Sequence, residues 1–341
     1  MGRIGSAIID FTEAAYDLEL GDEDWLPTML KRGLPVLEQG LGVAGYEYGI
    51  PPGTNEVELR DVYVASGPED FAERHLRALS SMDPQALRKQ LCSGAATTGS
   101  VASKDDQEQL EHYLSHVDYC KDVLYLTAVD ARGVGVAVVA PLPEITTLSQ
   151  QDAQRWQMLA AHVEAGHRLR QGIATGDADQ ASDGRLPHDA EAIFDANGFR
   201  VTDAVGPAKE RTAATKLRDA AISVDRARGQ MRNTDPDNAL EIWKALVRGR
   251  WSMVDWFDTD GRRFVLAIPN SPNVTDPRGL SERESQVVTL AVLGHSNKMI
   301  AYRLGLSSSR VSTVLRSAMR KMGFRTRAQM VKQMGDFQAM Q

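Results

Sequence analysis

Two stretches of the chain can continue neither a helix nor a central strand, and they divide its 341 residues. Residues 172–188 are rich in Gly, Asp and Ala and show no apolar periodicity, which is typical of a linker. Residues 269–279 contain three prolines, and proline lacks the N–H that a helix interior or a sheet ladder needs. At roughly 150 residues per domain, the length suits two or three domains. We therefore predict domains at 1–171, 189–268 and 280–341.

The charges are distributed unevenly along the chain. The whole chain has a net charge of −7, but from residue 276 onward there are eleven Lys and Arg against four Asp and Glu, a net charge of +7. The preceding 275 residues therefore have a net charge of −14. A basic segment attached to an acidic body predicts that only the C-terminal part binds a polyanion.

The composition is that of an ordinary globular protein, with 42% hydrophobic and 25% charged residues, so each segment can bury a core. Two cysteines are too few for a secreted disulfide scaffold, and neither a leader peptide nor an apolar run of about 18 residues is present. We expect a cytoplasmic protein without membrane association.

The last segment is predicted to form four helices. Ser281 and Glu284 have the spacing of a capping box, which begins the first helix. Serine begins and glycine ends the following helices, and a fourth helix from about Arg327 to Gly335 closes the bundle. The expected caps and stops are Ser296 and Ser307, and Gly294 and Gly305.

The third of these helices has one apolar face and one polar face. Its apolar positions follow helical spacing and should face the core: Val311, Val314, Leu315, Ala318, Met319 and Met322. The opposite face has small hydroxyls followed by cations: Ser308, Ser309, Ser312, Thr313, Arg316, Arg320 and Lys321. Small side chains permit close approach to base edges, and Arg can bind guanine or phosphate.

The stretch "LSERESQVVTLAVLGHSNKMIAYRLGLSSSRVSTVLRSAMRKMGFRTRAQ" resembles the LuxR/NarL type of four-helix helix-turn-helix domain. The resemblance covers about a fifth of the chain. It rests on widely spaced residues: Leu280, Glu284, Gly294, Ser296, Asn297, Lys298, Ile300, Ala301, Leu304, Leu306, Ser307, Val311, Lys321, Met322, Gly323 and Arg327.

The resemblance implies binding to double-stranded DNA, with the third helix in the major groove. The positions that match the family's base-reading residues are Ser312, Thr313 and Arg316. The matching phosphate contacts are Ser296, Asn297, Lys298, Ser309, Arg310 and Lys321, and Arg320 completes the expected DNA-binding set. Ser312 and Val314 replace the Lys and His that are common in the family, so the preferred base sequence does not carry over.

The first domain is predicted to contain a β-hairpin over 122–142, with a turn at 130–133. Both strands are apolar on both faces, which is typical of a central position in a sheet. A long helix follows over 148–171. This order resembles a GAF-like sensor domain.

The second domain is predicted to have the order strand, strand, helix, helix, strand, strand. The first pair turns at 197–198 and the second at 260–261, with helices near 208–229 and 237–247 between them. This order resembles a PAS-like domain. The predicted fold is therefore α+β and multidomain, with two α/β sensor-like domains (GAF-like, then PAS-like) followed by an all-α four-helix domain.

One group of side chains in the first domain has metal-ligand spacing. His112, His116 and Cys120 follow Glu108 at intervals of four, which places them on one face if the segment is helical. A strand is expected from Val123, so the helix could end before Cys120. Because structural histidines outnumber ligands, we favour packing over a metal or haem site. We predict no metal, and the cofactor stays open.

The remaining candidates also have a structural interpretation. Cys92 could be a redox thiol or a small core residue, and packing is the commoner role. A group of aromatic residues could line a pocket, although core packing is favoured: Trp243, Trp251, Trp256, Phe257 and Phe264. No partner can be recognised for His75, His162 or His167.

Several functional classes lack their motifs. The chain has no Gly-rich phosphate loop, nucleophile elbow or H-E-x-x-H pattern, so we expect no enzyme. Asp130 lies in a hairpin turn, and no alternating β-α array surrounds it as in a phosphorylated receiver domain. The Trp-Tyr-x-x-x-Trp signature of quorum-sensing relatives is also missing.

Two hypotheses remain. In the first, the chain is a sequence-specific transcription regulator whose front domains respond to an unknown small molecule or partner. It would act as a homodimer, through helices at 150–171 or 208–229, and could contact RNA polymerase. In the second, the chain is a protein-interaction adaptor with a nonspecific DNA-binding tail.

Overall fold

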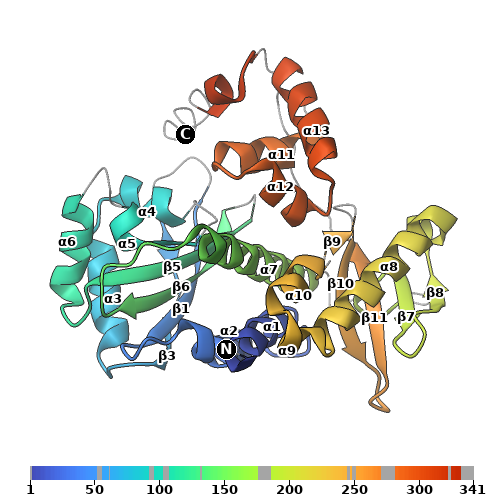
Figure 1. Cartoon of the computed structure of the whole chain (residues 1–341), viewed down its shortest axis with the longest axis horizontal. Helices are drawn as coiled ribbons and strands as arrows, with labels where there is room; N and C mark the ends of the chain where they lie inside the picture. Colours follow the sequence, from blue (N-terminus) through green and yellow to red (C-terminus); the bar gives the residue numbers. More distant parts are fainter. Residues whose placement is uncertain are drawn as a thin grey trace.

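The computed structural model describes residues 2–51, 56–60, 62–91, 96–102, 107–130, 133–175, 186–243, 246–247, 251–269, 281–321 and 324–331. Two antiparallel sheets lie at opposite ends of an α/β body, and a helical C-terminal part lies above the long helix between them (Figure 1). The predicted combination of α/β front segments and a helical C-terminal part is confirmed.

The first sheet has the strand order β2-β1-β6-β5-β4, and β3 also pairs with β1. The predicted hairpin is confirmed, because β5 and β6 pair along their whole length in the middle of this sheet. Every residue of β5 is buried. The strands are β1 (Val43–Gly49), β2 (Glu58–Leu59), β3 (Tyr63–Ser66), β4 (Ala96–Thr98), β5 (Asp122–Val129) and β6 (Val134–Leu142).

Helices cover both faces of the first sheet. On one face, buried side chains of α3, α4 and α6 pack against the strands, and on the other those of α1, α2 and α7 do. The helices are α1 (Gly2–Ala15), α2 (Asp22–Leu37), α3 (Phe71–Ser81), α4 (Pro84–Leu91), α5 (Gly99–Ala102), α6 (Gln107–His116) and α7 (Gln150–Thr175). The predicted long helix is therefore present, and it continues four residues into the segment expected to be a linker.

The second sheet has the order β8-β7-β11-β10-β9. Its predicted hairpin is confirmed, because β10 and β11 pair from Trp251 opposite Pro269 to Phe257 opposite Arg263. The strands are β7 (Ala192–Asp195), β8 (Val201–Ala204), β9 (Leu246–Val247), β10 (Trp251–Phe257) and β11 (Arg263–Pro269). The helical elements between and before them are η1 (Pro187–Asp189), η2 (Gly206–Lys209), α8 (Arg211–Arg228), α9 (Met231–Thr234) and α10 (Pro236–Ile242).

The prediction of a helix over 237–247 is wrong at its end. Helix α10 ends at Ile242, and Trp243 already has an extended backbone with ψ of 95°. Val247 then pairs with Trp251, because β9 extends the sheet beside β10. Strand pairing with β10 therefore replaces the last turns of the predicted helix.

Helix α7 crosses α1 at very short range. A Cβ atom added to Gly166 would lie 2.0 Å from the carbonyl oxygen of Ala15, so only glycine fits there. Helix α1 also packs against α9 and α10, and Gly5 of α1 lies against Pro236 of α10. Arg228 and Arg232 pair with Glu13 of α1 at 3.0 and 2.8 Å. Helix α1 therefore joins the first sheet to the second.

Within the described residues, no helix is both long and apolar enough to cross a bilayer.

Candidate nucleic-acid interface

The C-terminal helices begin and end where the sequence predicts. They are α11 (Glu282–Val292), α12 (Asn297–Leu304) and α13 (Ser308–Lys321), and residues 327–331 are helical as well. Ser281 and Glu284 form the predicted capping box. The hydroxyls of Ser296 and Ser307 accept from backbone N–H groups at 3.3 and 3.2 Å. Gly305 ends α12 in the left-handed conformation, at φ 62°.

The helices share a separate hydrophobic core. Val287 of α11, Ile300 of α12 and Val311 of α13 are fully buried, together with Met330 from the short last helix. The predicted apolar stripe of α13 faces this core, with Val314, Leu315 and Ala318 buried and Met319 partly buried. Met322 lies outside the described residues. Because its stripe faces inward, α13 presents the opposite face to solvent.

The outward face of α13 carries the hydroxyls and cations expected to bind DNA. The exposed residues are Ser308, Ser309, Arg310, Thr313, Arg316 and Arg320. Lys321 is the last residue of α13, and its side chain lies outside the described part of the structure. Ser296 and Lys298, at the start of α12, are also exposed. Cations and small polar groups therefore adjoin each other on two consecutive helices.

The side chains of Asn297 and Ser312 form hydrogen bonds within the domain. The Asn297 amide nitrogen donates to Ser312 Oγ at 3.0 Å, and its oxygen accepts from Arg327 Nη1 at 2.9 Å. Ser312 Oγ donates to the Ser308 carbonyl at 3.0 Å. These bonds tie α12, α13 and the last helix together, so both residues help to fix the angle between the helices.

Histidines that had no recognisable partner in the sequence lie beside polar groups from distant segments. His75 Nδ1 lies 2.8 Å from the Tyr113 hydroxyl, whereas His167 Nε2 lies 3.7 Å from Glu47 Oε1, which is beyond hydrogen-bond distance. His162 contacts two tyrosine hydroxyls, one from each end of the chain. Sequence reasoning missed these pairs because their members are far apart along the chain.

The suggested metal group does not form. Helix α6 ends at His116, so Cys120 does not share the histidine face, and its thiol donates to the Val117 carbonyl at 3.3 Å. Burial raises the pKa of Cys120 to about 11. The Glu108 side chain and Cys92 lie outside the described residues. In the described part of the chain, no three His, Cys, Asp or Glu side chains are arranged to hold a metal ion.

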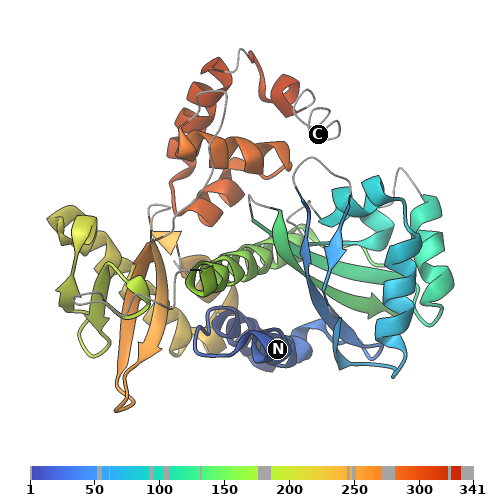
Figure 2. The same ribbon diagram turned by 180° about the vertical axis from the view of Figure 1, so that it is seen from behind.

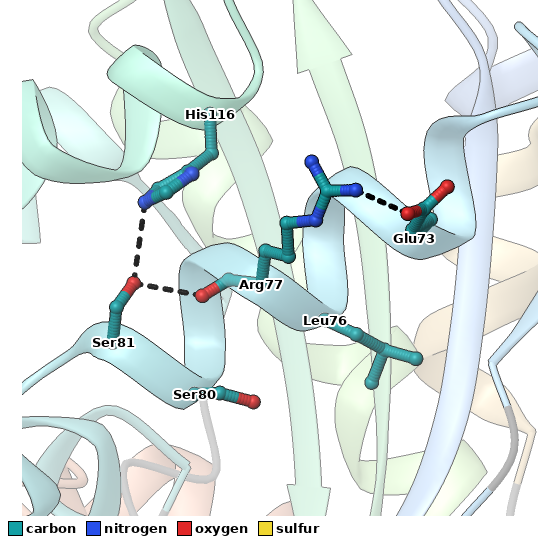
Figure 3. Close-up of a pocket in the computed structure, with 6 residues that line it drawn as sticks. All are labelled: Glu73, Leu76, Arg77, Ser80, Ser81 and His116. Carbon is teal, nitrogen blue, oxygen red and sulfur yellow. Dashed lines mark hydrogen bonds and ion pairs between the residues drawn. The ribbon is translucent and has the colours of Figure 1, made fainter.

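The two histidines of α6 meet the end of α3 instead. Their Nε2 atoms lie 2.7 Å (His112) and 3.3 Å (His116) from Ser81 Oγ. His116, Ser81, Arg77 and Glu73 line a hollow of about 490 Å³. Figure 3 shows the bond between His116 and Ser81 and the pair formed by Arg77 and Glu73. Ser81 Oγ also donates to the Arg77 carbonyl at 2.7 Å. The two histidines and Ser81 therefore bond to one another and to α3, as expected of structural residues.

The aromatic group of the second domain is mostly core. Trp243 and Trp251 are buried, and Trp256 packs on Phe264 with ring centroids 5.6 Å apart. Phe257 is 53% exposed and so belongs to neither a core nor a pocket. The other four side chains, Trp243, Trp251, Trp256 and Phe264, belong to the core beside the second sheet or pack against it.

Comparison with known proteins identifies the C-terminal part. Residues 278–334 match the profile of the GerE family, described as bacterial regulatory proteins of the luxR family. No curated protein matches the chain. The matched residues include all of α11, α12 and α13, with the capping box, the left-handed glycine and the inward apolar stripe described above. Residues 278–334 are therefore a helix-turn-helix domain of the LuxR family.

Proposed function

We propose that the chain is a transcription regulator that recognises a specific sequence in double-stranded DNA. The observation that carries this proposal is the exposed, cation-bearing face of α13 in a LuxR-family domain. The charge distribution also indicates that the C-terminal segment binds the DNA. The first 275 residues have a net charge of −14 and repel DNA, whereas the C-terminal segment has a net charge of +7 and attracts it.

The proposed contacts divide into base readers and phosphate binders. Thr313 and Arg316 are exposed on the middle of α13 and would reach base edges, together with Ser312. Phosphates would be bound by residues at the start of α12 and along α13: Ser296, Asn297, Lys298, Ser309, Arg310, Arg320 and Lys321. A single module of this size buries too little surface for tight specific binding, so a homodimer is proposed.

The body is proposed to be the sensory part. Its two sheets, each with helices packed beside it, support the GAF-like domain at 1–171 and the PAS-like domain at 189–268. Their signal would be a small molecule or a partner protein, and RNA polymerase is a further partner of a regulator of this kind. The proposed site of action is the cytoplasm, and no enzymatic step is needed.

Selection from a pool of random duplexes tests the proposal. The full chain is mixed with the pool at two salt concentrations, and bound DNA is amplified and sequenced. A dimeric regulator enriches a paired motif with half-sites about one helical turn apart. Salt-sensitive binding without enrichment would instead favour the adaptor with a nonspecific DNA-binding tail. The internal bonds of Ser312 favour this second candidate, because they reduce its freedom to contact a base.

Single substitutions on α13 separate base reading from phosphate binding. Arg316→Ala should cost about 1–3 kcal/mol on the selected duplex and much less on random DNA, because a base contact is lost. Lys321→Ala should weaken binding to both duplexes alike. Fluorescence anisotropy titrations measure both effects. Equal losses on the two duplexes for both variants would contradict the assignment of Arg316.

A further inference from the structure

Helix α12 has two buried faces, although a helix-turn-helix domain by itself needs only one. Ile300 and Leu304 face the core of the C-terminal domain. Met299 belongs instead to the core of the body, and Tyr302 packs against that core. Helix α12 contacts α7 and β9, and both views show it as the helix of the domain nearest the body (Figures 1 and 2). The DNA-binding domain is therefore docked on the body through α12.

A chain of hydrogen bonds runs through this docked interface. The Tyr302 hydroxyl donates to the Leu240 carbonyl at 2.8 Å, so it accepts from His162 Nε2–H. His162 Nδ1 then accepts from the Tyr16 hydroxyl at 3.0 Å, because a neutral imidazole has one donor and one acceptor. Each polar group finds the partner that it requires. The interface is therefore specific as well as apolar.

An ion pair lies beside this chain of hydrogen bonds. Arg303 Nη2 of α12 lies 3.5 Å from Glu164 Oε2 of α7, and both side chains are buried. Arg303 Nη1 also donates to His295 Nε2 at 3.0 Å. Glu164 also pairs with Arg168 of α7 at 2.6 Å, so Arg303 docks against a carboxylate that α7 already holds in place. Because separation would return both charges to water, the pair contributes to the specificity of docking more than to its strength.

The body also contacts a cation that is proposed to bind DNA. Lys298 Nζ lies 3.6 Å from Glu241 Oε1 of α10, and the two side chains are 67% and 55% exposed. In the docked domain, a carboxylate thus lies beside Lys298, which is one of the proposed phosphate contacts. A phosphate that approached Lys298 would meet the like charge of Glu241.

We propose that docking on the body and binding to DNA compete, with Glu241 occupying the position of a DNA phosphate at Lys298. The inference rests on the proposed DNA binding and adds its regulation. The outward face of α13 stays exposed in the docked domain, so the competition acts on the phosphate contacts of α12 and not on the base-reading face. Because coupling between two binding events is reciprocal, DNA should also loosen the docked interface.

The test compares two substitutions that change the charge of the body equally. Glu241→Gln removes the carboxylate beside Lys298, and Asp219→Asn removes an exposed carboxylate from α8 as the matched control. Binding of the full-length variants is measured at about 50 mM and 200 mM salt, on a selected duplex and on a random duplex. Glu241→Gln should bind both duplexes roughly three-fold more tightly than Asp219→Asn at the lower salt, and the difference should shrink at the higher salt.

A second measurement follows the docked interface itself. Saturating DNA should raise amide hydrogen exchange in α12 and in the part of α7 around His162, and Tyr302→Phe should raise it without DNA. Equal affinities of the Glu241 and Asp219 variants, or unchanged exchange with DNA, would overturn the competition.

The two proposals fail in different ways. If no sequence is selected but Glu241→Gln still tightens binding to random DNA, sequence-specific recognition is rejected and the competition stands. If a sequence is selected but the variants do not differ, only the competition is rejected. Absence of binding to either duplex at the lower salt rejects both.

Discussion

Lowering the pH from 8 to 5 is expected to reduce the free energy of unfolding by about 6 kcal/mol, or about 2 kcal/mol for each of three buried histidines. Burial lowers the pKa of His75, His162 and His295 to about 3 each. In the unfolded chain these imidazoles take up protons near their ordinary pKa of about 6.5. The stabilisation is therefore complete above pH 6.5 and is lost as the pH falls toward 3. Denaturant unfolding at a series of pH values measures it.

A variant isolates one of these contributions. His162→Gln keeps a side chain that can hydrogen-bond to both tyrosines but cannot titrate. Unfolding of the variant should therefore take up about one proton fewer, so its free energy of unfolding should fall less steeply with pH below pH 6. The His162 carbon resonances of the folded protein should stay in the neutral form down to pH 5. An imidazole that titrates near 6.5 in the folded chain would contradict the assignment.

Replacing Gly166 by alanine is expected to destabilise the body by about 3 kcal/mol or more, because the new methyl group has no space. Its carbon would lie 2.0 Å from the Ala15 carbonyl oxygen, and a backbone atom cannot rotate away as a side chain does. Helices α1 and α7 would have to separate along their crossing. Thermal and denaturant unfolding of the purified variant measure the loss.

The same helix supplies the control. Gly172 is exposed on α7, and a Cβ atom added there meets nothing within 4 Å. Gly172→Ala should therefore stabilise the protein by about 0.5–1 kcal/mol, because alanine is the better helix former. Opposite signs for the two substitutions would confirm that the contact with Ala15 causes the loss. A gain in stability for both substitutions would instead show that helix propensity outweighs the contact with Ala15.

Local signals in the sequence predicted local structure well. Ser281 with Glu284, Ser296, and Gly305 placed the ends of the C-terminal helices, because caps and stops act within one turn. The two long hairpins were also predictable, since each pairs neighbouring apolar runs across a short turn. Strand β9 was not, because its pairing with β10 outweighs the helical pattern before it.

Contacts between distant segments were not predictable from the sequence. His162 and Tyr302 are 140 residues apart, and neither belongs to a sequence motif that predicts contact with the other. One signal was available, because Met299 and Tyr302 lie three residues apart and off the apolar stripe of their domain. A second apolar face on α12 indicates a second neighbour, but it does not identify α7. The DNA-contact residues were proposed from resemblance and await the binding measurements.

The position of α1 between the two sheets has a consequence for synthesis on the ribosome. Gly5 of α1 lies against Pro236 of α10, so one side of this helix meets its partner only after roughly 230 further residues have been made. At about 5–20 residues per second, that delay is on the order of 10–50 s. During this interval the first sheet can form, while the surface of α1 that will face α9 and α10 stays uncovered. Assembly of the body must therefore wait for its second half, which supplies α9 and α10.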